Sequence, residues 1–218
     1  MIYSNERKLQ LSGWLQETHR AEYNSPLKLQ KFLLFYEAFT KTMGETPDFS
    51  HLRGWKRGPV FSNVWGDYTK ERRAFNSAAT TAYEKSQDAI NILRAKKCAF
   101  LVETLTETEL SELTHHLNLW KSKERRIMSG EYQVDLYEHD FNASDEAMIR
   151  ALDSMYPEKM IDESEIINLD RFYFVLPQKA MQQLTEAHID ILTSLAERED
   201  LHNPVYVDID KEGRLVVD

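Results

Sequence analysis

Residues 27–43 are the segment that most restricts how this chain can fold. The apolar residues at the three- and four-residue spacing of one helix face are Leu29, Phe32, Leu33, Tyr36 and Phe39. Ser25 suits the N-cap, Pro26 suits the first helical position, and Gly44 suits the residue after the last turn. The apolar stripe is wide, so we expect a central helix that neighbouring elements cover on several sides.

The segments around this helix also have mainly helical patterns. A loop of polar and aromatic residues is expected over 46–58, and Gly58-Pro59 is expected to turn the chain sharply into the next helix. Thr106 and Glu109 make a capping-box pattern. The predicted helices are 4–18, 59–71, 88–105 and a segment from Thr106 that ends at Gly130. These patterns predict a mainly α domain over residues 1–130.

The pattern changes after residue 130. Stretches that alternate between apolar and polar residues, or that are rich in β-branched and aromatic residues, favour short strands. We expect a β-hairpin made of residues 205–209 and 214–217 around a turn at 210–213. The other predicted elements are an extended segment at 132–137, a helix at 144–155, a strand at 171–176 and a helix at 178–199. Residues 131–218 are therefore predicted to form a smaller α+β C-terminal part with a short β-sheet or hairpin.

The formal net charge of −9 is unevenly distributed along the chain. Residues 1–75 have a net charge of +4, residues 76–130 have +1, and residues 131–218 have −14. An acidic surface repels nucleic acid phosphates and attracts a basic protein. The C-terminal part is thus either a second partner-binding surface or an acidic face that serves solubility.

Several function classes lack their sequence signatures. Cys98 is the single cysteine, so zinc sites built on two or more cysteines are excluded, and we expect a buried structural thiol. Glu112 and His116 share a helix face without a further spaced ligand, and Arg198 and His202 are too close in sequence for the helical RNase pattern considered. No apolar run approaches about 18 residues. We therefore expect a cytoplasmic protein that is not an enzyme and has no cofactor.

The other charged and polar groups have patterns typical of ordinary surface residues or of residues near helix ends. His115 and His139 are expected to be packing or surface histidines. Lys121, Lys123, Arg125 and Arg126 cluster near a helix end, where they suit the helix dipole or form a small patch for RNA or a partner.

The most informative segment runs from Leu52 to Trp65. Trp55, Lys56 and Arg57 stand immediately before Gly58-Pro59, so a stiffened turn presents an aromatic ring and two cations. Such a group is a plausible recognition surface, since aromatic and cationic side chains dominate many protein interfaces. The alternative is that Trp55 packs inward and solvent surrounds the two cations.

Two motifs in this half of the chain resemble the Panacea-domain antitoxin family, including its SocA-like members. Residues 26–36 resemble the Leu-x-Lys-Leu helix of the family, and Gly54-Trp55-Lys56-Arg57-Gly58-Pro59-Val60 resembles its Ala-Trp-Lys-Tyr-Gly-Pro-Val stretch. The order and spacing match over about residues 25–70, with a plausible extension to about residue 125. Gly54 and Arg57 depart from the family pattern.

The resemblance implies an antitoxin that neutralises a cognate protein toxin by direct binding, with a phage or mobile-element setting. It also implies a cytoplasmic protease as a further partner, because SocA-like members deliver their toxin to one. We expect a basic toxin, no membrane and no nucleic acid as partners; the alternative is a phage or mobile-element nucleic-acid-binding regulator or RNase. The expected partner-binding residues are Lys31, Tyr36, Trp55, Lys56, Arg57, Gly58 and Pro59.

Overall fold

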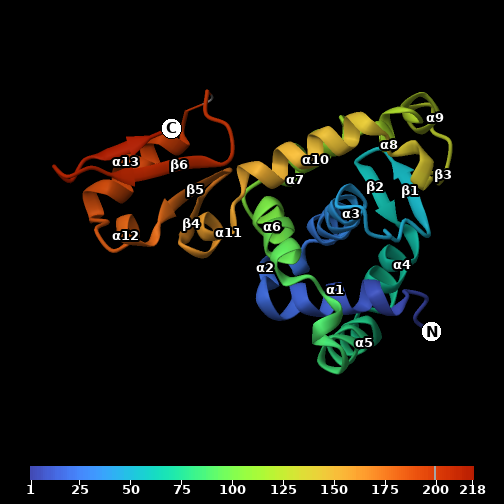
Figure 1. The fold of residues 1–218 in the computed structure, drawn as a ribbon. Helices are drawn as coiled ribbons and strands as arrows, with labels where there is room; N and C mark the ends of the chain where they lie inside the picture. The colour runs from blue at the N-terminus through green and yellow to red at the C-terminus, as the bar shows by residue number, and fades with distance from the viewer. Residues whose placement is uncertain (199) are drawn as a thin grey trace.

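A computed structural model describes residues 1–198 and 200–218. It contains a larger helical lobe and a smaller lobe built around a four-stranded sheet, each with its own hydrophobic core (Figure 1). The predicted fold class, mainly α with a smaller α+β C-terminal part, is confirmed. No helix within the described ranges is long and apolar enough to cross a membrane.

The larger lobe is built mostly from helices of the first 155 residues. Its main helices are α1 (Glu6–Thr18), α2 (Arg20–Asn24), α3 (Pro26–Thr42), α4 (Ser62–Lys70), α5 (Arg72–Lys85), α6 (Ile92–Glu103), α7 (Glu107–His115) and α10 (Ala143–Met155). The short helices are α8 (Asn118–Lys121), α9 (Glu124–Met128) and two 3₁₀ turns, η1 (Gln87–Ala89) and η2 (Glu138–Asp140).

Helix α3 is the centre of this lobe, as the sequence predicts. It is buried along nearly its whole length, and α1, α2, α4, α6, α7 and α10 all pack against it. The Ser25 side chain accepts a hydrogen bond from the Lys28 backbone N–H, and Pro26 begins the helix. The predicted capping box of α7 is also present, with reciprocal bonds between Thr106 and Glu109.

The region between α3 and α4 differs from the prediction. Residues 52–55, expected in a loop, form strand β1 (Leu52–Trp55), and Pro59, expected to start a helix, lies in strand β2 (Gly58–Phe61). Helix α4 begins only at Ser62. Strand β2 is an edge of the sheet β2-β1-β3, where the missing N–H of a proline is tolerated. The third strand, β3 (Val134–Asp135), pairs antiparallel with β1.

The smaller lobe confirms the predicted strands and hairpin. Its sheet has the order β4-β5-β6-β7, made of β4 (Ser164–Leu169), β5 (Phe172–Pro177), β6 (Val205–Ile209) and β7 (Leu215–Val217). Strands β4–β5 and β6–β7 are antiparallel, whereas β5–β6 is parallel. Helix α11 (Glu158–Asp162) leads into the sheet.

The predicted helix over 178–199 is interrupted. It is divided into α12 (Gln178–Met181) and α13 (Glu186–Ala196), and residue 199 lies outside the described residues. The Thr185 hydroxyl caps the second helix by accepting from the His188 N–H, which gives the chain a local reason to restart there. The sequence pattern of this predicted helix also places Ile191 on its apolar face, but the side chain is exposed.

The two lobes meet through both apolar and polar contacts. Val175 of β5 is buried in the core of the larger lobe, and Ile166 and Tyr206 pack against that core. Residues 134–156 pack into the core of the larger lobe, so the second core starts further along the chain than the change in charge at residue 130. The Asn203 amide donates to the Glu109 carboxylate (3.0 and 3.2 Å) and to the Arg171 carbonyl, and it accepts from the Tyr173 N–H. This asparagine therefore ties the start of β6 to the N-terminus of α7.

Candidate functional site

The β1–β2 hairpin places the predicted recognition residues at its tip. Trp55 and Gly58 are cross-strand partners, and Lys56 and Arg57 form the two-residue turn between them. Gly58 has a φ of +99°, a left-handed conformation that glycine adopts without strain. The turn leaves the side chains of Lys56 and Arg57 exposed, while Gly58 and Pro59 are buried.

The backbone of this tip is fixed on both sides of Lys56. The Trp55 carbonyl accepts a hydrogen bond from the indole N–H of Trp120 at 2.9 Å. The Arg57 carbonyl accepts one from Lys31 Nζ at 2.8 Å. We refer to Trp55, Lys56 and Arg57 with these anchored carbonyls as the hairpin tip.

Lys31 supports the tip from inside the protein. Its side chain is 1% exposed, and Nζ also donates to Thr114 Oγ1 at 3.0 Å. Burial, together with the nearby Arg57 guanidinium, lowers the pKa of Lys31 from 10.5 to about 7. A Cβ at Gly58 would lie 2.2 Å from Lys31 Nζ, so only glycine leaves room for this contact.

An apolar pocket opens beside the hairpin tip. Its volume is about 290 Å³. The residues that line it are Leu27, Gln30, Lys31, Trp55, Lys56, Arg57, Val60 and Trp65. Trp55 and Trp65 meet edge to face with ring centroids 5.3 Å apart. We call this the tip pocket, and it is of the size that accepts one or two side chains.

The two cations at the mouth of the tip pocket differ in their partners. Arg57 contacts Glu107 at 3.0 Å, but the arginine side chain is 60% exposed and the glutamate 40% exposed. Such an exposed pair contributes little to stability, so either partner can exchange it for another ion. Lys56 has no ion-pair partner among residues 1–198 and 200–218.

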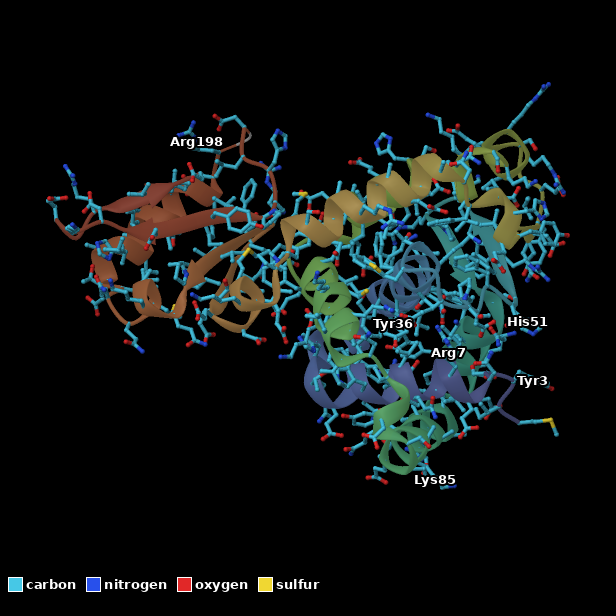
Figure 2. All side chains as sticks on the ribbon, in the orientation of Figure 1. Tyr3, Arg7, Tyr36, His51, Lys85 and Arg198 are labelled. Carbon is cyan, nitrogen blue, oxygen red and sulfur yellow. The ribbon has the colours of Figure 1, made fainter. Side chains whose placement is uncertain are left out.

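Tyr36 lies apart from the tip, inside the larger lobe (Figure 2). Its hydroxyl accepts the Asn91 N–H at 3.0 Å, and the guanidinium of Arg94 lies 5.3 Å from its ring. Burial raises the pKa of Tyr36. The structure thus brings Lys31, Trp55, Lys56, Arg57, Gly58 and Pro59 together and leaves Tyr36 in the interior.

The titratable residues that were considered as metal ligands or catalytic groups do not lie together in one site. Within the described parts of the chain, no three His, Cys, Asp or Glu side chains are placed to hold a metal ion. His115 stacks on Trp120 with ring centroids 3.8 Å apart, and burial lowers its pKa. Cys98 is fully buried, as predicted, and burial raises the pKa of its thiol.

Several site residues were missed by sequence reasoning. The sequence pattern places Trp65 on one side of the helix predicted at 59–71 and gives it no role in binding, but it forms one wall of the tip pocket. Trp120 was expected on the inner face of the segment that follows Thr106, and Leu27 was expected only to mark the start of the central helix. Only the pairing of β1 with β2 brings Trp55 beside Trp65, and no local pattern signals that pairing.

None of the protein-family models, curated proteins or solved structures with which the chain was compared matches it. The resemblance to the Panacea-domain family accordingly stays a prediction from the two motifs quoted above.

Proposed function

We propose that this protein is an antitoxin that neutralises a cognate protein toxin by direct binding, as its resemblance to the Panacea-domain family implies. The observation that carries the proposal is the hairpin tip: two exposed cations and Trp55 border an open apolar pocket on an anchored backbone. Interfaces concentrate binding energy in such aromatic and cationic residues around a pocket. A rigid tip also reduces the entropy that binding would cost.

The acidic C-terminal part is proposed as a second contact surface. Its net charge of −14 over residues 131–218 favours a basic surface on the toxin and would accelerate their encounter. Delivery of the bound toxin to a cytoplasmic protease is a further step in this proposal.

Co-expression tests the proposal. The reading frame adjacent to the gene for this protein should arrest growth when induced alone, and this protein should restore growth. An adjacent frame that is harmless alone, or a toxic one that this protein does not rescue, would contradict the proposal. The half-life of the toxin, measured with and without this protein, separates delivery to a protease from occlusion.

Trp55→Ala tests whether neutralisation uses the hairpin tip. We expect loss of rescue with a circular dichroism spectrum unchanged from wild type, because Trp55 is only partly buried. Tyr3→Ala is a matched control, since this aromatic side chain is 71% exposed, lies at the N-terminus and is not among the residues of the hairpin tip or the tip pocket (Figure 2). Full rescue by folded Trp55→Ala would move the interface elsewhere, and a salt-dependent gel shift with RNA would favour a nucleic-acid-binding function instead.

A further inference from the structure

We propose that the tip pocket binds an acidic segment of the partner, which inserts one large apolar side chain between carboxylates. This inference rests on the proposed function for the identity of the partner, and it adds the chemistry of the contact. It also distinguishes this site from the second lobe, whose charge suits a basic surface.

The walls of the pocket define the inserted group. Leu27, Val60 and the two indoles of Trp55 and Trp65 line it, and the volume of about 290 Å³ accommodates a leucine or phenylalanine side chain. Aromatic walls favour an aromatic guest, since offset or edge-to-face pairs add to the gain from burial.

The charges at the mouth define what flanks the inserted group. Lys56 and Arg57 are adjacent and exposed on the turn, and Lys31 lies beneath the pocket. The one acidic side chain paired to them in the described residues is Glu107, through a largely exposed contact with Arg57. A carboxylate from the partner can therefore pair with Lys56 directly and replace Glu107 at Arg57.

The backbone that carries these two cations is held in place before a partner binds. Their Cα positions are fixed by the bonds from Trp120 to the Trp55 carbonyl and from Lys31 to the Arg57 carbonyl. Only the two long side chains lose freedom when a partner binds, so the entropic cost is small.

The second lobe limits where such a segment can bind. The hairpin tip lies near the junction of the two lobes, because Arg57 contacts Glu107 and Glu109, in the same first turn of α7, accepts hydrogen bonds from Asn203. Residues 131–218, which include β3 beside the hairpin as well as the smaller lobe, have a net charge of −14 and repel an acidic segment, whereas the cations of the tip attract it locally. An acidic peptide that binds this protein in spite of its negative net charge would consequently indicate a specific binding site.

Three fluorescein-labelled peptides test the proposal by fluorescence polarisation on the full chain. The first is Glu-Asp-Phe-Glu-Asp, the second replaces Phe by Ser, and the third replaces the four acids by Lys. We expect saturable binding of the first at low ionic strength and about tenfold weaker binding of the second. Equal binding of the first two, or tighter binding of the third, would overturn the proposal.

Charge-reversal variants locate the binding. Lys56→Glu with Arg57→Glu should weaken binding of the first peptide about tenfold or more. The matched control is Arg73→Glu with Lys85→Glu, which makes the same charge change at exposed positions of α5, a helix that lies away from the β1–β2 hairpin (Figure 1). Equal losses in both double variants would indicate a general effect of net charge and contradict the tip as the site.

The two proposals fail in different ways. If the peptide binds at the tip and no adjacent frame is toxic, the antitoxin function is wrong and the binding site stands. If Trp55→Ala abolishes rescue and no acidic peptide binds, the antitoxin function stands and the chemistry assigned to its partner is wrong.

Discussion

The ammonium nitrogen of Lys31 lies 2.8 Å from the carbonyl oxygen of Arg57, so a buried residue of the central helix holds the exposed turn of the hairpin. Thr114 Oγ1 is its second partner, at 3.0 Å. This contact connects α3, α7 and the β1–β2 hairpin at one atom. Changes at Lys31 are therefore expected to affect both stability and the geometry of the hairpin tip.

The stability of the protein should depend on pH through Lys31. Because burial lowers its pKa from 10.5 to about 7, the unfolded chain binds a proton between these values that the folded protein has released. Stability therefore rises with pH across this interval, by at most about 1.4 kcal/mol per pH unit, and the full cost of the buried charge is present below pH 7.

Lys31→Met isolates this effect. Urea unfolding at pH 7, 8 and 9 should show the free energy of unfolding of wild type rising relative to that of Lys31→Met. Lys121→Met removes an exposed ammonium instead and should track wild type across the same range. A difference between wild type and Lys31→Met that stays constant with pH would show that Lys31 keeps its proton.

Gly58→Ala should disrupt the same contact from the other side. The added Cβ would lie 2.2 Å from Lys31 Nζ and 2.4 Å from Thr114 Oγ1, and the φ of +99° is unfavourable for alanine. Gly44→Ala is the matched control, because its φ is +79° and its Cβ would meet nothing within 4 Å. We expect a loss of about 1–2 kcal/mol for Gly44→Ala and at least twice that for Gly58→Ala in urea unfolding. Equal losses would mean that Lys31 and Thr114 move aside freely.

Helices α1, α3, α6 and α10 and the C-terminal strands were predictable because their signals are local. Helix α5 was not predicted, and the segment predicted from Thr106 to Gly130 is divided into α7, α8 and α9. The cap at Ser25, the Thr106–Glu109 capping box and the alternation in 205–209 each act within a few residues. The hairpin at residues 52–61 was not predictable in this way. Strand β1 pairs with β2 on one side and with β3, about 80 residues away, on the other, and this sheet outweighs the tendency of Gly58-Pro59 to start a helix.

The candidate site was predictable in its residues but not in its geometry. Trp55, Lys56 and Arg57 stood out because an aromatic residue and two cations precede Gly58-Pro59. No local sequence pattern indicates that Lys31, and not Lys28, donates the hydrogen bond to the turn of the hairpin. That distinction depends on how α3 is rotated against α7.

Glu37 should be among the most costly positions to neutralise. Its fully buried carboxylate accepts hydrogen bonds from Arg7, from Lys8 Nζ at 2.5 Å and from the Asp48 N–H at 2.9 Å. Glu37→Gln removes the buried charge partner of Lys8 and leaves it only Asp48, at 3.3 Å, so we expect a loss of about 3–5 kcal/mol in urea unfolding.

An exposed pair provides the comparison for Glu37. Glu131 contacts Arg126, and both side chains are about half exposed. Glu131→Gln should change the free energy of unfolding by less than about 1 kcal/mol, since exposed ion pairs contribute little. Similar losses for the two variants would mean that water reaches the Glu37 carboxylate.

The contact between α1 and α5 should depend on the absence of a side chain at Gly13. A Cβ there would lie 2.2 Å from the Ala79 carbonyl oxygen and 2.7 Å from the Tyr83 Cβ, so the helices would have to separate. Gly66 lies in α4 and its Cβ would meet nothing within 4 Å. Gly66→Ala should therefore stabilise the protein by up to about 1 kcal/mol through helix propensity alone. Gly13→Ala gains the same propensity and should still destabilise the protein, because backbone of α5 blocks the new methyl group. If both variants raise the midpoint of thermal unfolding equally, α5 packs less closely against α1 than these distances require.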